Sequence, residues 1–444
     1  GEPWVEKFEW IPALNLELTF RMDVLSWVMS LLVLGVGSLV LFYCTSYFSH
    51  SSESVGGFAA HLFSFCAAMF GLITADDFIV MFIFWEITTI LSYLLIGHAH
   101  NRLSARRSAL QALTVTTAGG LAMFVGIIML GQSAGTYSLA ELVVRGPQIV
   151  ADVEAGHGIL TGVQLSAALF LILCGALSKS ALFPLHFWLP GAMAAPTPVS
   201  AYLHAAAMVK AGIYLLIRFS PGYGMVAIWE NTLVIFGAFT MVFGGWVALK
   251  QTDLKLILAY GTVSQLGFLA LIVSAGTPNA LYAAMAMMLA HSLFKAALFL
   301  TVGIIDHQSG TRNIHKLSGI FRRAPVLFAV GLISAASMAG IPPLAGFVAK
   351  EAVLETYLER LMHAENGSVL LLDLVTVGAI VLGSILTFAY SARFVWGAFA
   401  TKPASFMENI DEIKFCQTHY DRNPAQLAHL EKSPDTLFHR VNFT

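Results

Sequence analysis

The stretch that decides the fold runs from Cys174 to Arg218 and reads CGALSKSALFPLHFWLPGAMAAPTPVSAYLHAAAMVKAGIYLLIR. Its apolar runs are interrupted by prolines at Pro184, Pro190, Pro196 and Pro198. Because proline removes a backbone donor and breaks helices, hydrocarbon tolerates such a break only where protein or water supplies new partners. The apolar runs also carry two lysines, Lys179 and Lys210. A broken helix that holds buried lysines predicts the lining of an ion path.

The composition of the chain indicates a membrane protein. Hydrophobic residues make up 57% of the 444 residues and charged residues only 11%, whereas a soluble domain carries roughly 25% charged residues. The mean hydropathy is +0.75, and apolar runs long enough to span a bilayer recur along the chain. We therefore expect a multi-pass protein of the cell inner (plasma) membrane, with the lipid bilayer as a partner. The formal net charge of -2 gives no case for binding nucleic acid.

The cysteines give no sign of a metal or redox site. Cys44, Cys66, Cys174 and Cys416 lack the CxxC spacing of metal and redox sites. The sequence contains no haem, iron–sulfur or nucleotide motif. We therefore expect no cofactor, no metal ion and no redox catalysis by this chain.

The apolar segments predict the fold. They lie at about 22–48, 58–75, 76–97, 107–131, 163–195, 198–218, 227–249, 255–275, 280–304, 324–360 and 368–398. Two of them, 163–195 and 324–360, are too long for one straight span of about 20 residues, and each holds prolines with a lysine nearby, Lys179 and Lys350. We predict an all-α polytopic membrane protein with about eleven transmembrane helices, two of them discontinuous, in two pseudo-symmetric inverted halves.

The basic residues predict the orientation and the domain limits. One set of alternate loops and helix ends carries eleven lysines and arginines, and the other set carries five. Because basic residues collect on the cytoplasmic side, we expect residues 1–21 to lie outside. Residues 22–400 would form the transmembrane domain, and residues 401–444 a polar cytoplasmic tail. The chain begins with Gly1, and we expect it to be part of a longer protein.

Ionisable side chains within the apolar segments are the candidate functional residues. They are Glu86, Lys179, His204, Lys210, His291, Lys295, Lys350 and Glu351. A charge near the bilayer centre costs a few kcal/mol, so this many in one chain indicates a function. A nearby carboxylate holds the proton on a buried lysine, and a lysine whose carboxylate partner moves can load and unload a proton. Glu86 and Lys179 form the most economical pair, and His291 and Lys295 share a helix face.

Structural roles are the alternative for each of these residues. Glu86 and Lys179 would then only fix helix packing, and the two histidines would only bond carbonyl groups. Lys350 would extend its ammonium to the membrane interface, while Glu351, which points differently, would face a loop or a partner. We expect Asp253 and Lys255, in the short stretch KQTDLK, to form a solvated turn.

The chain carries blocks that resemble the antiporter-like family shared by complex I and the Mrp cation/proton antiporters. The blocks are PTPVSAYLHAAAMVKAG, KQTDLKLILAYGTVSQLG and HSLFKAALFLTVG. The segment GIIDHQSGTRNI most resembles the A-type component of the Mrp antiporters, and the resemblance covers residues 20–400. This sequence lacks the two helices that normally precede the family's segment beginning near Met22, and its polar end does not resemble the helices that follow in the A-type component.

The resemblance implies which residues carry protons. In the family a glutamate on one helix pairs with a lysine on the next broken helix, which here match Glu86 and Lys179. Further family positions fall on Lys210, on His291 with Lys295, and on Lys350 at the second break. A lateral chain of protonatable groups linked by water, and assembly into a large multi-subunit membrane complex, are also implied.

Three functions are therefore open. The first is a proton-translocating subunit of a multi-subunit monovalent cation/proton antiporter of the Mrp type, with protons and sodium as the transported ions. The second is a proton-pumping membrane subunit of NADH–quinone oxidoreductase, in which case the chain would be a non-redox part of an enzyme. The third is a scaffold whose buried charges only hold helices together. No carboxylate and carbonyl cluster in the sequence can be assigned as a sodium site.

Overall fold

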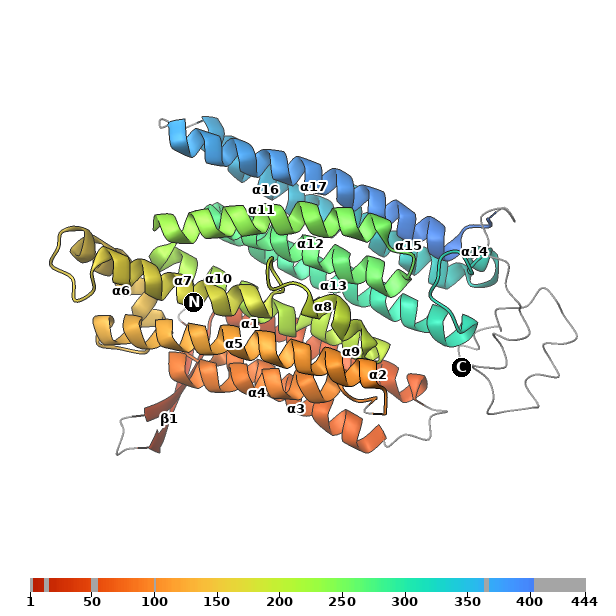
Figure 1. The fold of residues 1–444 in the computed structure, drawn as a ribbon, viewed down its shortest axis with the longest axis horizontal. Helices are drawn as coiled ribbons and strands as arrows, with labels where there is room; N and C mark the ends of the chain where they lie inside the picture. Colours follow the sequence, from red (N-terminus) through yellow and green to blue (C-terminus); the bar gives the residue numbers. More distant parts are fainter. Residues whose placement is uncertain (1–2, 12–15, 49–54, 100, 363–366, 403–444) are drawn as a thin grey trace, which may run out of the picture.

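The computed structural model describes residues 3–11, 16–48, 55–99, 101–362 and 367–402. The long helices lie side by side along one direction (Figure 1). The described residues are almost all helical apart from one hairpin, β1 (Trp4–Ile11) and β2 (Leu16–Met22), which pairs antiparallel with Trp4 opposite Met22. The predicted all-α membrane fold is confirmed.

Among the described residues, the first part of the chain forms six helical crossings and two shorter helices, α6 and α8. Its elements are α1 (Val24–Ser30), the π-helical η2 (Leu31–Val36), α2 (Gly37–Tyr47), α3 (Val55–Thr74), α4 (Phe78–Ile96), α5 (Leu103–Ala134), α6 (Leu139–Glu154), α7 (Gly162–Lys179), α8 (Trp188–Gly191), η3 (Ala192–Ala194), α9 (Thr197–Ala201), the π-helical η4 (Tyr202–Ala206) and α10 (Met208–Tyr223). Elements α1, η2 and α2 form the first crossing, and α9, η4 and α10 form the sixth.

The second part continues the same up-and-down path. Its elements are α11 (Ala227–Lys250), α12 (Leu254–Ser274), α13 (Pro278–Ser309), α14 (Ile320–Arg323), α15 (Pro325–Ala339), α16 (Ala345–Met362) and α17 (Gly367–Phe399). In the described residues, 10 helical segments are long and apolar enough to cross a membrane, and Pro325–Ala339 is a shorter apolar helix. These agree with the segments that the sequence predicts.

Local signals set the helix limits. The carboxylate of Asp77 accepts the backbone N–H groups of Ile79 and Val80, and thereby satisfies two orphan donors at the start of α4. Asp253 caps α12 in the same way. Helices α5 and α13 end where Gly135 and Gly310 adopt a left-handed conformation, which glycine does without steric cost.

Helix α6 was not predicted, because its charged residues and Pro147 do not form an apolar run. The helix packs on α10 through a close backbone approach. A Cβ atom on Gly146 would lie 2.7 Å from Cα of Gly222, so only a pair of glycines permits this contact.

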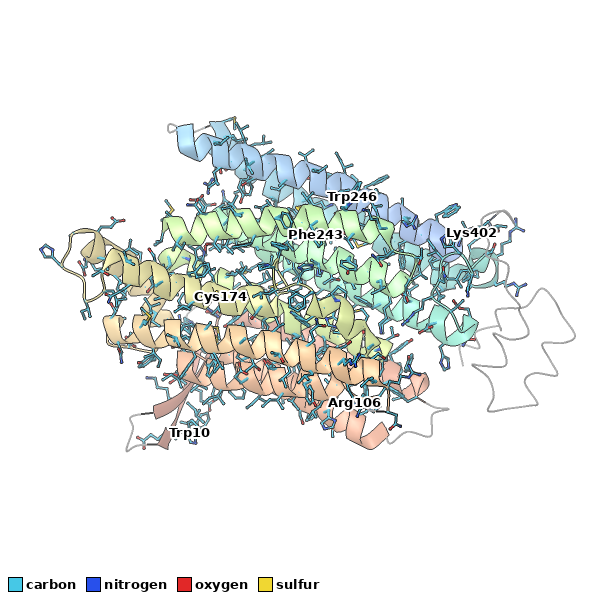
Figure 2. All side chains as sticks on the ribbon, viewed as in Figure 1. Trp10, Arg106, Cys174, Phe243, Trp246 and Lys402 are labelled. Atoms are coloured by element: carbon cyan, nitrogen blue, oxygen red, sulfur yellow. The ribbon has the colours of Figure 1, made fainter. Side chains whose placement is uncertain are left out.

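Short backbone bridges occur at both ends of the bundle. Short bridges join Phe20 to Ala75 at one end, and Asp253 to Asn313 at the other. Figure 2 shows Arg106 and Lys402 at the end opposite to Trp10, as the count of basic residues in alternate loops predicts. Which end is cytoplasmic stays a prediction. The predicted tail, 401–444, also stays a prediction, and its residues from 403 on lie outside the described residues.

The helix that contains Lys210 lies at the centre of the bundle. The most apolar window of the crossing Thr197–Tyr223 is fully buried, whereas in Leu371–Phe399 only 33% of the corresponding window is buried. Helix α10 therefore has protein neighbours on all sides, and α17 lies at the edge.

Both predicted helix breaks are present. Helix α7 ends at Lys179, and regular helix resumes only at Trp188. Helix α15 ends at Ala339, and α16 begins at Ala345. Lys179 lies before the first break, whereas Lys350 lies after the second. The relation of the two halves by an inverted pseudo-symmetry stays a prediction.

Candidate functional site

Lys179 reaches from the end of α7 to the neighbouring helix α4. Its ammonium donates three hydrogen bonds, to the carbonyl oxygen of Trp85 at 2.7 Å and to the hydroxyls of Thr88 and Thr89 at 2.7 and 2.8 Å. It also lies 4.8 Å from the centroid of the Trp85 ring. The side chain is fully buried. An ammonium has three donors, and all three are used, which offsets the cost of burying this charge.

Glu86 lies beside this lysine but does not form an ion pair with it. No ion pair among the described residues joins the two, and Oε1 of Glu86 is buried without a hydrogen-bond partner in the described structure. The carboxylate lies against α5, because a Cβ atom on Gly120 would come 2.2 Å from Oε1. The predicted pair is thus brought close, with the lysine bound to a carbonyl and two hydroxyls.

Lys210 and His291 meet in the centre of the bundle. Nζ of Lys210 lies 2.6 Å from Nδ1 of His291, and both side chains are fully buried on α10 and α13. Nε2 of His291 has no hydrogen-bond partner in the described structure. An ammonium can donate to a neutral imidazole nitrogen, so this contact can hold one proton between the two side chains.

Lys295 lies one turn further along α13. Its ammonium donates to the carbonyl oxygen of Leu258 at 3.0 Å and lies 5.8 Å from the ring centroid of Tyr390. Gln265, which sequence reasoning did not single out as a path residue, is buried nearby and donates to Thr387 and Tyr390, while its Oε1 has no hydrogen-bond partner in the described structure.

His204 lies in the π-helical turn η4. The ring is fully buried, and neither nitrogen has a hydrogen-bond partner in the described structure. Its ring lies beside that of Trp188, with ring centroids 6.2 Å apart. Among the described residues, the ring therefore lacks the carbonyl contact that a purely structural histidine would make.

The prediction that Lys255 lies in a solvated turn is wrong. The side chain is buried, and its ammonium donates to the carbonyl oxygens of Met193 at 2.9 Å and Ala195 at 2.6 Å. These carbonyls belong to the short segments after the first break, where regular helical bonding is interrupted. Asp253 does stay near the end of the bundle, where it pairs with Arg312. A partial indication of this burial was present in the sequence, because carbonyl groups freed by a helix break require hydrogen-bond donors.

Lys350 and Glu351 have different surroundings. Lys350 is buried, and its ammonium donates to the carbonyl oxygen of Ala339, at the end of α15, at 3.0 Å. Glu351 is exposed on the outer face of α16. The structure therefore brings Lys350 to the second break but leaves Glu351 apart from the buried groups.

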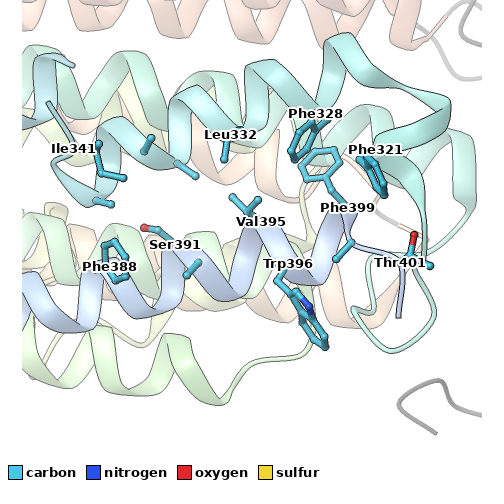
Figure 3. A pocket seen from close by; sticks show the side chains of 15 residues that line it. Phe321, Phe328, Leu332, Ile341, Phe388, Ser391, Val395, Trp396, Phe399 and Thr401 are labelled. Atoms are coloured by element: carbon cyan, nitrogen blue, oxygen red, sulfur yellow. The ribbon is translucent and has the colours of Figure 1, made fainter. Parts of the chain in front are cut away.

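An apolar cavity near the second break is not part of this arrangement. It has a volume of about 550 Å³ and lies between α15 and α17, lined by side chains such as Phe328, Leu332 and Trp396 (Figure 3). None of the candidate residues lines it. Within the described residues, no group of three His, Cys, Asp or Glu side chains could hold a metal ion.

An ion pair between Arg218 and Asp23 lies at one end of the bundle, beside the central helix α10. The guanidinium of Arg218 on α10 contacts the carboxylate of Asp23, the hydroxyl of Ser26 and the hydroxyl of Tyr214. Burial raises the pKa of Asp23, but the hydrogen bond and the charge of Arg218 outweigh burial, so the pKa lies below its usual value. Asp23 therefore stays ionised and ties α1 to α10.

The fold and these contacts define a polytopic membrane protein with acidic, basic and imidazole groups buried from α4 to α16. Such groups are rare within membrane spans and mark ion or proton pathways. The chain belongs to the family described as NADH:quinone oxidoreductase/Mrp antiporter, TM, whose model matches residues 75–378. Residues 9–65 also match the model described as NADH-Ubiquinone oxidoreductase (complex I), chain 5 N-terminus. The resemblance found in the sequence is confirmed.

Known proteins similar to the chain include components of antiporters. It is 41% identical over 397 residues to a protein of Rhizobium meliloti named as the probable A/B component of a K(+)/H(+) antiporter, a match that covers 89% of this chain and 38% of that protein. It is 38% identical over 431 residues to a "Putative antiporter subunit mnhA2" of Staphylococcus epidermidis, covering 93% of this chain and 51% of the relative.

A solved structure has the same fold. A chain in the structure of the Mrp complex from Dietzia sp. DQ12-45-1b matches with a TM-score of 0.82 and 41% sequence identity, over 91% of this chain and 43% of that chain. This protein therefore spans about half or less of the length of these relatives.

Proposed function

We propose that the chain is a proton-translocating subunit of a multi-subunit monovalent cation/proton antiporter, with sodium as the exchanged cation. Protons would pass along Glu86, Lys179, His204, Lys210, His291, Lys295 and Lys350. The single observation that carries the proposal is the contact between Lys210 and His291, 2.6 Å long and fully buried. Replacing a buried charged pair by apolar side chains of similar volume is often neutral or stabilising, so stability alone does not call for this contact, whereas the pair can exchange a proton.

The first transfer step would take place between α4 and α7. Glu86 directly follows Trp85, whose carbonyl oxygen binds the Lys179 ammonium, and the hydroxyls of Thr88 and Thr89 hold the ammonium when the carboxylate does not. Movement of the lysine between these two environments would change how tightly it binds its proton. This arrangement supports the role of Lys179 as a switch.

The later steps would use the groups around α13. His291 has one nitrogen toward Lys210 and the other without a hydrogen-bond partner in the described structure. An imidazole that binds a donor on one side and is open on the other is suited to pass a proton. Lys295 is the next group on the same helix face, and Lys350 would be the exit from this chain.

Other subunits and the plasma membrane belong to the same proposal. Two relatives are named as subunits of antiporters, and the similar solved chain comes from the structure of an Mrp complex. The relatives also bear on the cation, since one is named for potassium. Sodium and potassium must therefore be compared directly.

Membership of an NADH–quinone oxidoreductase is the second candidate, because the family model covers such proteins as well. Here the buried groups would pump protons driven by redox chemistry in other chains. Purification of the complex distinguishes the two: flavin and iron–sulfur proteins would accompany the chain only in the second case.

Exchange in everted membrane vesicles tests the proposal. We expect Glu86→Gln and Lys179→Ala to reduce sodium-driven and potassium-driven proton exchange at least tenfold in a complex that still assembles. Lys250→Ala is the matched control, because Lys250 is an exposed lysine that stacks on Trp246, 4.9 Å from its ring centroid. Unchanged exchange in both site variants would show that the buried charges only hold helices together.

A further inference from the structure

Two π-helical turns in different crossings contact each other through Tyr202. The first is η2, in the crossing Val24–Tyr47, and the second is η4, in the crossing Thr197–Tyr223. The hydroxyl of Tyr202, the first residue of η4, donates to the carbonyl oxygen of Val33 in the middle of η2 at 2.9 Å. Single π turns inside α-helices occur frequently at functional sites.

The acceptor is a carbonyl that its own helix satisfies only in part. The N–H of Gly37 is shared between the carbonyl oxygens of Leu34 and Val33. The thiol of Cys66 donates weakly to the same Val33 oxygen, at 3.6 Å. The tyrosine hydroxyl therefore supplies the strongest side-chain donor to a carbonyl that an ordinary α-helix would satisfy by itself.

The sequence leaves room for this contact. A Cβ atom on Gly37 would lie 3.2 Å from the hydroxyl of Tyr202 and 3.3 Å from the sulfur of Cys66. The ring of Tyr202 packs edge-on against Phe65, with ring centroids 5.8 Å apart. Tyr202 and Val33 are fully buried, so the bond lies in the packed interior.

The turn η4 sets the direction of His204 relative to Lys210. The N–H of Ala207 donates to the carbonyl oxygen of Tyr202, five residues earlier, at 3.1 Å. Ala207 itself departs from helical geometry, with φ -121° and ψ -86°, and a new helix begins at Met208. A return of this turn to α-helical register would rotate the preceding residues by about 100° and shift them by about 1.5 Å.

We propose that Tyr202 is a positioning residue whose hydroxyl, bound to Val33, holds η4 in its π register and couples it to η2. This coupling keeps the buried ring of His204 beside the ring of Trp188 and fixes its register relative to α10, which carries Lys210. The first crossing, which contributes none of the candidate proton carriers, thereby acts on the proton path. The inference rests on the proposed transport function for its effect on activity, but not for the coupling itself.

Hydrogen exchange and transport together test this inference in the full-length chain assembled in its complex. We expect Tyr202→Phe to speed amide exchange about fivefold or more in both segments, 31–37 and 202–207. We also expect a maximal rate of cation/proton exchange lowered about fivefold, with an unchanged apparent affinity for sodium or potassium. The loss of one buried hydrogen bond sets this scale.

Tyr223→Phe is the matched control. Tyr223 lies on α10, in the same crossing as Tyr202. Its hydroxyl also donates to a backbone carbonyl, that of Leu142 at 3.1 Å, and this carbonyl belongs to α6 and not to a π turn. For Tyr223→Phe we expect a lower melting temperature, with no change in amide hydrogen exchange in segments 31–37 and 202–207. Gly37→Ala, which crowds the hydroxyl of Tyr202, should reproduce the effect of Tyr202→Phe.

Faster exchange in only one of the two segments, or the same exchange pattern in Tyr202→Phe and Tyr223→Phe, would overturn the coupling. If amide exchange became faster in both segments but the rate of cation/proton transport did not fall, the positioning role would be overturned. Failure of the proposed transport function is distinguishable, because the wild-type complex would then show no cation/proton exchange while the two segments still changed together.

Discussion

The two helix breaks satisfy their backbone groups in different ways. At the first break some partners come from other helices: Thr240 on α11 accepts the N–H of Phe183. Trp188, where the broken helix resumes, donates through its indole to the carbonyl oxygen of Ser178. Lys255 on α12 donates to two carbonyls of the segments that follow. The first break is therefore held by tertiary contacts.

The second break is satisfied by the broken helix itself. The N–H groups of Gly340 and Ile341 both donate to the carbonyl oxygen of Ala336. Lys350, from α16, donates to the carbonyl oxygen of Ala339 at the end of α15. This break also lies nearer the edge of the bundle, where Glu351 is exposed.

The difference bears on the two lysines. Lys179 is bound by the neighbouring helix α4, so its proton affinity depends on how α4 and α7 sit together. Lys350 is bound by its own broken helix and lies beside an exposed face. Motions between α4 and α7 would therefore change the surroundings of Lys179, whereas those of Lys350 depend on α15 and α16.

The largest effect is expected at the first break. The double substitution Thr88→Val with Thr89→Val removes two of the three acceptors of the Lys179 ammonium. Hydrogen bonds to charged groups contribute about 1.5–3 kcal/mol each, so we expect a loss of about 3 kcal/mol in stability and a tenfold or greater loss of exchange. Thermal unfolding and vesicle transport measure the two effects.

Thr114→Val is the control for that substitution, since Thr114 is an exposed threonine on α5 whose hydroxyl bonds within its own helix. Equal losses in the control and the double variant would remove the contrast between the two breaks.

The second effect concerns the ion pair at the end of the central helix. Asp23→Asn replaces a carboxylate that binds Arg218, and we expect a loss of about 2 kcal/mol at neutral pH. Because the pKa of Asp23 is lowered in the folded state, the stability that the carboxylate contributes is present above its ordinary pKa of about 3.9. It is lost as the pH falls through the lowered value.

The pH dependence of thermal unfolding checks this prediction. The melting temperatures of the wild type and of Asp23→Asn should differ at pH 7 and converge as the pH falls below about 4. A difference that stays constant over this range would show that the charge of Asp23 does not stabilise the fold.

The third effect is expected at the second break. Gly340 has φ +86°, and a Cβ atom placed on it would lie 2.9 Å from Cδ of Lys350. Gly340→Ala forces a side chain into a left-handed conformation at a cost of about 1–2 kcal/mol. We expect a lower melting temperature and a moderate loss of transport. Gly378→Ala, at a glycine of α17 with open space around it, should have neither effect.

The smallest effect is expected for Glu351→Gln. The carboxylate is exposed and lies apart from the buried groups, so exchange by the assembled complex should change less than twofold. Lys350→Gln, one residue away, should reduce exchange far more. A large loss for Glu351→Gln would place the outer face of α16 on the ion path and reverse the comparison between these neighbours.

Much of the fold could be predicted from local sequence patterns. Apolar runs predicted the crossings, and the prolines with nearby lysines predicted both breaks. The spacing of four residues placed His291 and Lys295 on one helix face. These features depend on hydropathy and on helix geometry, which are properties of short stretches.

Other features could not be predicted from the sequence, because they depend on contacts between residues that are distant in the chain. The burial of Lys255 follows from free carbonyls near Met193, 62 positions earlier in the chain. The contact between Lys210 and His291 joins residues 81 positions apart. Helix α6 was missed because its packing against α10 uses two glycines instead of an apolar run.

The sequence by itself determined that this is a membrane protein of helices, with ionisable side chains where hydrocarbon would exclude them. Only the tertiary structure decided which of these groups meet. It placed Lys179 against the hydroxyls of α4 instead of the carboxylate of Glu86, and it joined two π turns through Tyr202. The physical reason is that the cost of burying a charge can be read from one segment, whereas the partner that offsets it comes from whichever helix packs alongside.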